Sequence, residues 1–437
     1  MKRKIYYELL NWKNNPDRKP LLLQGARQVG KTYIVKAFGK DQYRNFHHFN
    51  FEKDPILKTF FKGSLDPKTI LDSLSLYIGK KIENSDTLIF FDEIQVSPEA
   101  ITSLKYFCEE ASEYHLIAAG SLLGVSVGKK SSFPVGKVDF MTLFPMSFSE
   151  YLSAFGDELL ADEIEKTTGT EPFLEPLHNK LIEKHKLFLY LGGMPEVLQS
   201  YLKHGDIAKV RNIQNSILDA YKRDFSKYAE SEQAIKTSEI WNSIPYQLAK
   251  ENKKFKYSDV RKNSRASTFE NSIEWLKNAG LIYPAYNIST PKLPVAGYTD
   301  RLKFKLYMSD TGLLGAMLNL TSDIIVKPAE IFSEYNGAFI ENYVATELMA
   351  KYNKELFYWT SKNDAEVDYV IVHKNNIYPV EVKSGLSGDI KSLRSYQDKY
   401  KPRLIVRLSP KNFVRDKEFI NIPLYAAAEI TRIIGSL

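Results

Sequence analysis

Short apolar runs alternate with amphipathic stretches over the first half of the chain. "PLLLQ" and "HLIAA" are two such runs, and Leu88–Phe91 forms a third between them. Each run has the length of a buried strand, and the stretches between them repeat apolar residues at helical spacing. The pattern predicts an α/β fold with a parallel sheet, in which ligand-binding loops follow the carboxyl ends of the strands.

The loop after the first run, "GARQVGKT", spaces Gly25, Gly30, Lys31 and Thr32 as a phosphate-binding loop does. The glycines let backbone N–H groups close around phosphates, and the helix that follows adds the partial positive charge of its N-terminus. Lys31 can reach the β- and γ-phosphates, Thr32 can ligate Mg²⁺, and Tyr33 is assigned to the same site. The alternative is a glycine turn with an unrelated lysine. The strand before the loop and the helix after it favour nucleotide binding.

Acidic and polar residues end the other two runs. Asp92 is expected to hold Mg²⁺ through water, and Glu93 to act as the catalytic base that polarises the attacking water. This pair favours hydrolysis, with Lys31 and Glu93 as the catalytic residues. Ser121, after the third run, is predicted to sense the γ-phosphate. The alternatives are two acids at a solvent-exposed strand end and, for Ser121, ordinary turn chemistry.

Composition narrows the class of protein. Of 437 residues, 43% are hydrophobic and 26% charged, which is typical of a soluble protein with well-formed cores. The single cysteine, Cys108, excludes a disulfide framework and a cysteine-ligated zinc site. The N-terminus has no signal-peptide core, and the longest apolar run is too short to span a bilayer, so a cytoplasmic protein is expected. The net charge of +7 permits a polyanionic partner without requiring one.

Residues 1 to 230 resemble the AAA-type ATPases of bacteria and archaea (AAA_14). The residues that carry the resemblance are "GARQVGKT", "DEIQ", "GS", "LFPMSFSEYL" and "YLGGMPEVLQSYL". The resemblance implies ATP and Mg²⁺ as cofactors. It also implies a helical lid in which Gly193 and Pro195 pack against the adenine. For these two residues the alternative is a turn that begins a helix.

A winged helix is predicted from about residue 231. "TSEIWNSIPYQLAKEN", "YSDVRKN" and "STFENSIEWLKNAG" have the pattern of three helices, and "LIYPAYNIS" and "RLKFKLYMSD" that of a β-hairpin wing. Arg261, Lys262, Arg265 and Lys277 can face phosphates, so nucleic acid is an expected partner. A solvated helical face with a structural or protein-docking wing is the equally weighted alternative.

Charged residues interrupt apolar strands near the C-terminus. In "VDYVIVHKNNIYPVEVKSG", a predicted hairpin brings Asp368 beside Glu381 and Lys383, and Glu341 can approach from the helix "FIENYVATELM". Three carboxylates form an oxygen-rich pocket suited to Mg²⁺ or Mn²⁺. A lysine beside them can serve a catalytic water in phosphodiester cleavage. The alternatives are a surface ion-pair network and a former nuclease site that only binds nucleic acid.

The order acid, Asp, Glu-x-Lys resembles the PD-(D/E)xK nuclease fold. The region from about 230 to 437, with "LYMSDTGLLGAM" and "FIENYVATEL", resembles the DUF4143 module. We therefore predict four domains: an ATPase core (1–160), a helical lid (161–230), a winged helix (231–325) and a nuclease-like α/β domain (326–437). The predicted function is an ATPase coupled to a nucleic-acid-directed, nuclease-like domain, and oligomers are possible. The alternative is a nucleotide switch whose C-terminal domain docks a protein without cleavage.

Overall fold

A computed structural model gives the structure in two compact units. It describes residues 3–84, 86–120, 134–228, 231–250, 253–321, 336–361, 365–386 and 389–436. The N-terminal unit comprises Lys2–Phe144 with Asn278–Gly280, and the C-terminal unit Pro145–Lys277 with Leu281–Leu437. The predicted boundaries at 230/231 and 325/326 both fall inside the C-terminal unit.

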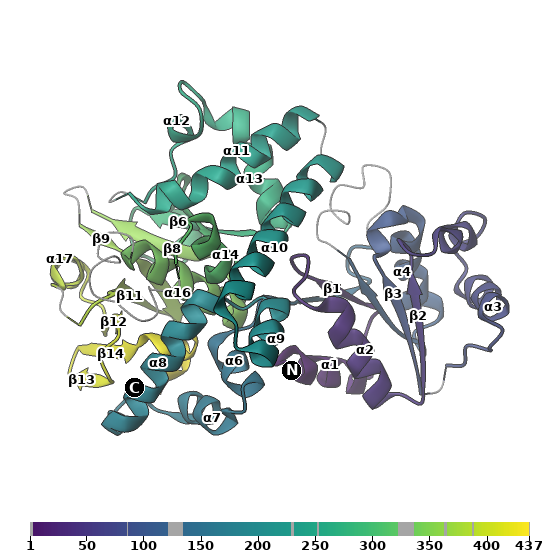
Figure 1. Cartoon of the computed structure of the whole chain (residues 1–437), viewed down its shortest axis with the longest axis horizontal. Coiled ribbons are helices and arrows are strands. Elements are labelled where there is room, and N and C mark those ends of the chain that lie inside the picture. The colour runs from purple at the N-terminus through teal and green to yellow at the C-terminus, as the bar shows by residue number, and fades with distance from the viewer. Residues whose placement is uncertain are drawn as a thin grey trace. The chain divides into compact units, whose positions relative to one another are not determined.

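The N-terminal unit is built on a five-stranded, all-parallel sheet in the order β2-β3-β4-β1-β5 (Figure 1). Its strands are β1 (Leu21–Gln24), β2 (Asn45–Asn50), β3 (Thr87–Asp92), β4 (His115–Ala119) and β5 (Asp139–Thr142). Its helices are α1 (Ile5–Asn14), α2 (Lys31–Gln42), α3 (Pro67–Ile78) and α4 (Pro98–Glu110), with 3₁₀ turns η1 (Pro55–Phe61) and η2 (Ile94–Val96). The predicted parallel α/β sheet is confirmed, and β1, β3 and β4 are the three predicted strands. Since β3 and β1 both flank β4 in parallel, the loops that follow them lie at one edge of the sheet.

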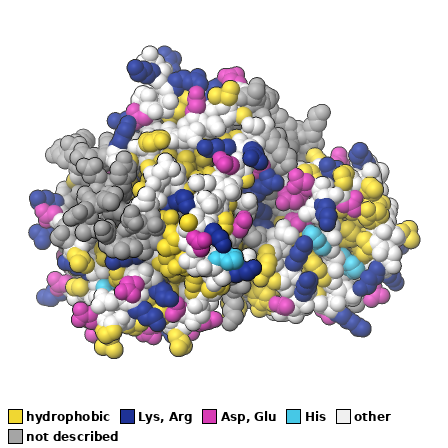
Figure 2. Space-filling model, in the orientation of Figure 1, with side chains coloured by type: hydrophobic (Ala, Val, Ile, Leu, Met, Phe, Trp, Pro, Cys, Tyr) yellow, Lys and Arg dark blue, Asp and Glu magenta, His cyan; other side chains and the backbone are white. Residues whose placement is uncertain are grey.

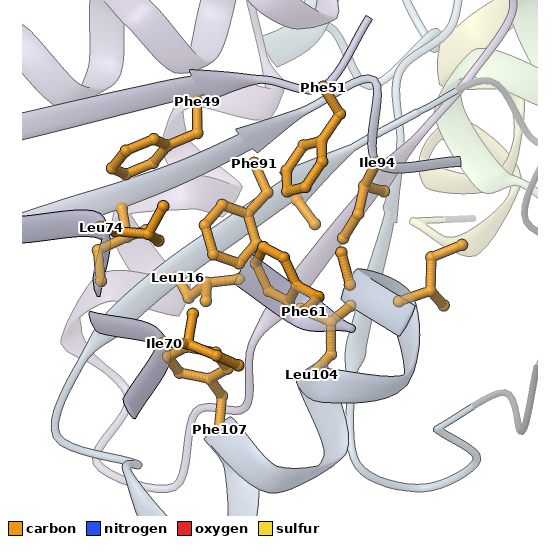
Figure 3. Packing of buried hydrophobic residues seen from close by; sticks show 14 of the residues in the cluster. Phe49, Phe51, Phe61, Ile70, Leu74, Phe91, Ile94, Leu104, Phe107 and Leu116 are labelled. Atoms are coloured by element: carbon orange, nitrogen blue, oxygen red, sulfur yellow. The ribbon is translucent and has the colours of Figure 1, made fainter. Parts of the chain in front are cut away.

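Packing around Phe91 fixes the end of β3 (Figure 3). The Phe91 ring meets Phe51, Phe61 and Phe107 edge-on, with centroids 5.6, 5.7 and 6.1 Å away. These rings come from the residue after β2, from η1 and from α4, and they pack against one face of the strand. The residues that follow Phe91 therefore start from a rigid position.

The C-terminal unit begins with a helical part. Its helices are α6 (Phe148–Ala154), α7 (Glu158–Lys166), α8 (Glu175–Leu191), α9 (Pro195–His204), α10 (Ile207–Tyr228), α11 (Ser231–Leu248), α12 (Tyr257–Val260) and α13 (Ala266–Asn278). Ser147 and Glu150 form a capping box that begins α6. Pro195 begins α9, and Gly205 ends it in the left-handed region at φ +64°. The three helices predicted for the winged helix are present as α11, α12 and α13.

The predicted wing belongs to a larger sheet. Strands β6 (Ile282–Ile288) and β7 (Thr299–Met308) pair antiparallel, as predicted, around η3 (Val295–Tyr298). However, β6 also pairs in parallel with β8 (Leu356–Thr360), which pairs with β9 (Glu366–Val367). The sheet has the order β7-β6-β8-β9, so it joins strands from the predicted winged helix and the predicted nuclease-like domain.

A second five-stranded sheet in this unit has the order β10-β11-β12-β14-β13. Its strands are β10 (Tyr369–His373), β11 (Asn376–Val382), β12 (Ile405–Ser409), β13 (Val414–Asp416) and β14 (Phe419–Pro423). The remaining helices are α14 (Thr311–Met317), α16 (Asn336–Tyr352), α17 (Lys391–Tyr400), η4 (Leu424–Glu429) and α18 (Ile430–Gly435). The predicted hairpin is confirmed, because β10 and β11 pair antiparallel with Tyr369 opposite Val380. Asp368 itself lies between β9 and β10.

Charges of both signs share the surface. Figure 2 shows Lys and Arg side chains beside Asp and Glu side chains over the described residues of the face in view. Ion pairs such as Lys137–Glu109 and Arg301–Glu355 account for part of this mixing. Within the described parts of the chain, each helix is too short or too polar to cross a membrane.

Candidate active site

The loop between β1 and α2 takes a backbone shape that its glycines permit. Gly25 has φ +147°, and a Cβ at this position would lie 2.2 Å from the carbonyl oxygen of Leu143. Gly30, immediately before α2, has φ +97°. Both positions strain or exclude an L side chain, so the two predicted glycines are required by the fold of the loop.

Lys31 lies inside this loop. Its ammonium donates to the carbonyl oxygens of Gly25 (2.9 Å) and Ala26 (2.8 Å). Burial lowers the pKa of Lys31 to about 8, although the carboxylates of Glu93 and Asp92 act to raise it. A cation held with so little solvation is well placed to pair with phosphate oxygens.

Thr32, in the first turn of α2, contacts Asp92 at the end of β3. The Thr32 hydroxyl lies 3.1 Å from each carboxylate oxygen of Asp92. On the other side, His48 Nε2 and the Asn50 side-chain amide each lie 3.1 Å from Asp92 Oδ2. His48 and Asn50 belong to β2, and Asn50 pairs with Asp92 in the sheet register. These contacts hold the carboxylate in place, which is the role expected of residues behind a metal ligand.

Glu93 has an unusual backbone conformation. It has φ +55° and ψ +39°, in the left-handed region, directly after β3. The side-chain amide of Gln95 donates to its carboxylate at 2.5 Å. Gly120 gives Gln95 its room, because a Cβ there would lie 2.4 Å from Gln95 Oε1. A non-glycine residue in this conformation is strained, and such strain often marks a functional position.

These residues form one constellation at the edge of the parallel sheet. The oxygens of Thr32 and Asp92 suit Mg²⁺, a hard cation that keeps several waters and shares its ligands with substrate phosphates. When bound, the ion neutralises charge on the phosphates. Lys31 would pair with the same phosphates, and Glu93 would orient a water. The donor set therefore fits a magnesium nucleotide.

Four further predicted nucleotide residues have different surroundings. Ser121 lies outside the described residues. Tyr33 is on α2 and is 61% exposed. Gly193 and Pro195 belong to the C-terminal unit, where the Gly193 amide donates to Asp310 at 2.6 Å and its carbonyl accepts from the Met146 amide at 2.7 Å. This is the helix-starting turn given as the alternative; the adenine contact stays a prediction.

Glu341, in α16, is the centre of a buried charged cluster in the C-terminal unit. Its carboxylate pairs with the ammonium groups of Lys253 and of Lys305, the latter at 3.4 Å, and accepts from the Tyr307 hydroxyl at 3.1 Å. Burial acts to raise the pKa of Glu341, but the two lysines outweigh it and lower the pKa. Lys305 also contacts Glu366 at 2.5 Å.

Asp368, Glu381 and Lys383 extend the same cluster. Asp368 Oδ1 lies 3.9 Å from Lys305, and its Oδ2 accepts from the amide of Val382 at 2.8 Å. Burial, with the charges of Glu341 and Glu381, raises the pKa of Asp368 well above its usual value. Lys383 contacts Glu381 Oε1 at 2.6 Å, while Glu381 Oε2 is buried without a hydrogen-bond partner. Burial is also the main cause of the raised pKa of Glu381.

The predicted carboxylates thus share one cluster, but their arrangement does not fit a metal ion. Two lysines lie among them, and burial raises the pKa of Asp368, which disfavours the charged carboxylate that a metal would need. In the parts of the chain that the structure describes, no group of three or more His, Cys, Asp or Glu side chains could hold a metal.

Sequence reasoning missed residues in both sites. His48 and Asn50 alternate along the strand "NFHHFN", which ends in polar residues and pairs with β3. These polar residues at the strand end were the signal that could have identified the two side chains. Lys305 lies in the apolar strand "KFKLYM", where an isolated lysine needs an acidic partner. Lys253 precedes α12 and carries no comparable signal.

Family models match three separate stretches. Residues 17–152 match the AAA domain model AAA_14, and residues 336–426 match a domain of unknown function, DUF4143. The predicted resemblance to these two families is confirmed. Residues 182–324 match another domain of unknown function, DUF8612, so the DUF4143 match is narrower than the predicted 230–437.

Solved structures resemble the chain at low identity. The Walker-type ATPase PABY2304 of Pyrococcus abyssi aligns over 73% of this chain and 95% of its own, with 14% identity and a TM-score of 0.45. ORC1 of Aeropyrum pernix, solved with DNA, aligns over 73% and 91%, with 11% identity and a TM-score of 0.29. AMPPCP-bound DnaA of Aquifex aeolicus aligns over 63% and 87%, with 12% identity and a TM-score of 0.26. No curated protein matches the chain.

Proposed function

We propose that this chain, whose residues 17–152 match an AAA domain, binds ATP with Mg²⁺ and hydrolyses it. The observation that carries the proposal is the contact of the Thr32 hydroxyl with both oxygens of Asp92, beside the buried ammonium of Lys31. Thr32 and Asp92 would hold Mg²⁺, Lys31 the β- and γ-phosphates, and Glu93 the attacking water. Hydrolysis then removes the γ-phosphate that these residues bind together, which is how nucleotide switches change state.

Two substitutions test the division of roles. Lys31→Ala should abolish or greatly weaken ATP binding, because Lys31 meets the phosphates in the ground state. Glu93→Gln should keep binding and lower kcat by about 10²-fold or more, the range of general-base catalysis. Binding is measured with a fluorescent ATP analogue and turnover by phosphate release. Glu99→Gln, a change on the exposed start of α4, is the matched control. A Glu93→Gln protein with wild-type turnover would remove Glu93 from this role.

For the C-terminal unit, we propose an output that docks a partner protein without cleaving nucleic acid. Lys253 and Lys305 support this reading, since they neutralise the carboxylates that a metal nuclease would leave free. Metal-dependent cleavage is the second candidate. The observation in its favour is the buried, unpartnered Glu381 Oε2 next to Lys383.

A cleavage panel decides between these outputs. Single- and double-stranded DNA and RNA are incubated with the protein, ATP and either Mg²⁺ or Mn²⁺, with EDTA as a blank. We expect no cleavage. Cleavage that disappears in Asp368→Ala and Glu381→Ala and slows in Lys383→Ala would establish the nuclease instead. Cleavage that persists in all three variants would come from a contaminating nuclease, and the proposed docking of a partner protein would stand.

A further inference from the structure

The charged cluster of the C-terminal unit contains a cation of its own. The Lys305 side chain is fully buried. Its ammonium contacts Glu366 at 2.5 Å, Glu341 at 3.4 Å and Asp368 at 3.9 Å. These carboxylates come from β9, from α16 and from the residue between β9 and β10. One ammonium is thus close to carboxylate oxygens from two parts of the chain, α16 and the stretch from β9 to β10, as an oxygen-ligated metal ion would be.

We propose that the Lys305 ammonium is the resident cation of this cluster, and that no divalent metal binds there while Lys305 stays in place. The inference deepens the non-cleaving output proposed above. It can fail separately, because metal binding and cleavage are measured independently.

The other contacts of the cluster leave little room for a second cation. Lys253 occupies the remaining oxygen of Glu341, and the amide of Val382 occupies Asp368 Oδ2. Lys383 occupies one oxygen of Glu381. Among the described atoms of these carboxylates, Glu381 Oε2 is the buried oxygen without a partner. Lysine ammonium groups therefore hold oxygens of Glu341, Glu366 and Glu381, the type of ligand that a divalent metal would need.

The backbone holds Lys305 at this position. Lys305 pairs with Ala285 in the register of β6 and β7, so its Cα is fixed within the sheet. Its ammonium also lies 5.1 Å from the centre of the Tyr358 ring, from β8, the strand on the other side of β6. A metal could replace the ammonium only if the side chain moved out of a fully buried site. Repulsion between the two cations at low dielectric would otherwise exclude the ion.

Lys305→Met tests the inference, because it removes the charge and keeps an unbranched apolar side chain. Mn²⁺ binding is followed by the loss of the free-ion EPR signal, without nucleotide, in the full-length protein. We expect no Mn²⁺ at the cluster in the wild type and saturable binding in Lys305→Met. The variant should melt below the wild type, and added Mn²⁺ should raise its midpoint. Lys303→Met, on the same strand with a 60% exposed side chain, should behave as the wild type does.

Asp368→Asn locates the bound ion. In the Lys305→Met background it should abolish Mn²⁺ binding. The proposal is overturned if the wild type binds Mn²⁺ and Asp368→Asn alone removes it. It is also overturned if a folded Lys305→Met protein binds no Mn²⁺ at millimolar concentration. Should Lys305→Met fail to fold without metal, the comparison of the wild type with Asp368→Asn decides.

Discussion

Lys31 illustrates how a single residue is prepared for its ligand. In the loop it donates to the carbonyls of Gly25 and Ala26, and burial lowers its pKa to about 8. The unfolded chain binds this proton more tightly, with a pKa near 10.5, so the stability of the nucleotide-free protein should rise with pH between these values. Phosphate oxygens would supply the missing counter-charge and raise the pKa of Lys31 again.

ATP binding should therefore take up a proton at Lys31 when the pH is near or above 8. Calorimetry in two buffers of different ionisation enthalpy measures this uptake. We expect it to increase from pH 7 to pH 9, because the fraction of neutral Lys31 in the empty protein increases over that interval.

Lys31→Arg is the control for this experiment. A guanidinium stays protonated throughout this pH range, so any binding that the variant retains should show no such uptake. Equal uptake by both proteins would assign the proton to another group.

At the residue scale, the structure brings together the predicted residues that lie near strand ends, and their roles stay predictions. Asp92 ends β3 and Glu93 follows it, whereas Lys31 and Thr32 begin α2 after the loop from β1. A parallel sheet brings these strand ends together. Lys305 could not be assigned to the acidic cluster, because its partners lie 36 and more residues further along the chain. Contacts at such separations depend on how strands pair, which local patterns do not specify.

At the scale of elements, the structure of the segment α11–α13 shows which of its basic residues have acidic neighbours. Arg261 pairs with Glu239 at 2.7 Å, and Lys277 pairs with Glu274 at 3.4 Å. Two of the four cations predicted to face phosphates thus have an acidic neighbour on the same surface. Such exposed ion pairs are weak, so a polyanion can still compete for the cations. Its binding free energy is reduced by the cost of breaking the pairs.

Replacing Arg261, Lys262 and Arg265 together with Ala tests this face. If it binds nucleic acid, the slope of log K against log salt should fall by about 0.9 for each phosphate that the variant no longer neutralises. If the C-terminal unit docks a partner protein instead, any nucleic-acid binding that the protein shows should keep the same slope in the variant. Fluorescence anisotropy with labelled DNA and RNA at several salt concentrations measures it.

A charge-matched control uses Lys62, Lys68 and Lys81, which are exposed in the N-terminal unit. Their replacement by Ala changes the net charge by the same amount. A drop in slope for the control as large as for the test variant would reveal a general charge effect.

Element prediction was accurate for types and poor for partners. The pattern of "LIYPAYNIS" and "RLKFKLYMSD" correctly predicts two paired strands. It carries no sign that β6 also pairs with β8, because β6 is apolar on both faces and can be either an edge or a central strand. Only the segment beyond residue 355 completes the sheet.

At the scale of the whole molecule, the chain has separate hydrophobic cores in its two units. One surrounds Phe91 in the N-terminal unit, and another surrounds Trp359 in the C-terminal unit. Because cooperative unfolding follows such cores, we expect two transitions in calorimetry.

Mg²⁺ and ATP should stabilise the transition of the N-terminal unit. At about 100 times Kd the gain is about 2.7 kcal/mol for a ligand that binds only the folded state. Lys31→Ala should lose this shift. A melting curve in which both transitions move together with ATP would show that the nucleotide also stabilises the C-terminal unit, and would contradict the expectation.

The sheet β7-β6-β8-β9 also constrains how such proteins can evolve. Strands β6 and β7 lie in the stretch that matches DUF8612, whereas β8 and β9 lie in the stretch that matches DUF4143. Recombination between these stretches would separate Ala285–Ile288 from Leu356–Trp359 and leave unpaired backbone on both fragments. Neither stretch can then be exchanged unless the strand that pairs with it is exchanged too. We therefore expect the two to be inherited as a pair, and a gene fusion that carries one alone to yield an aggregating protein.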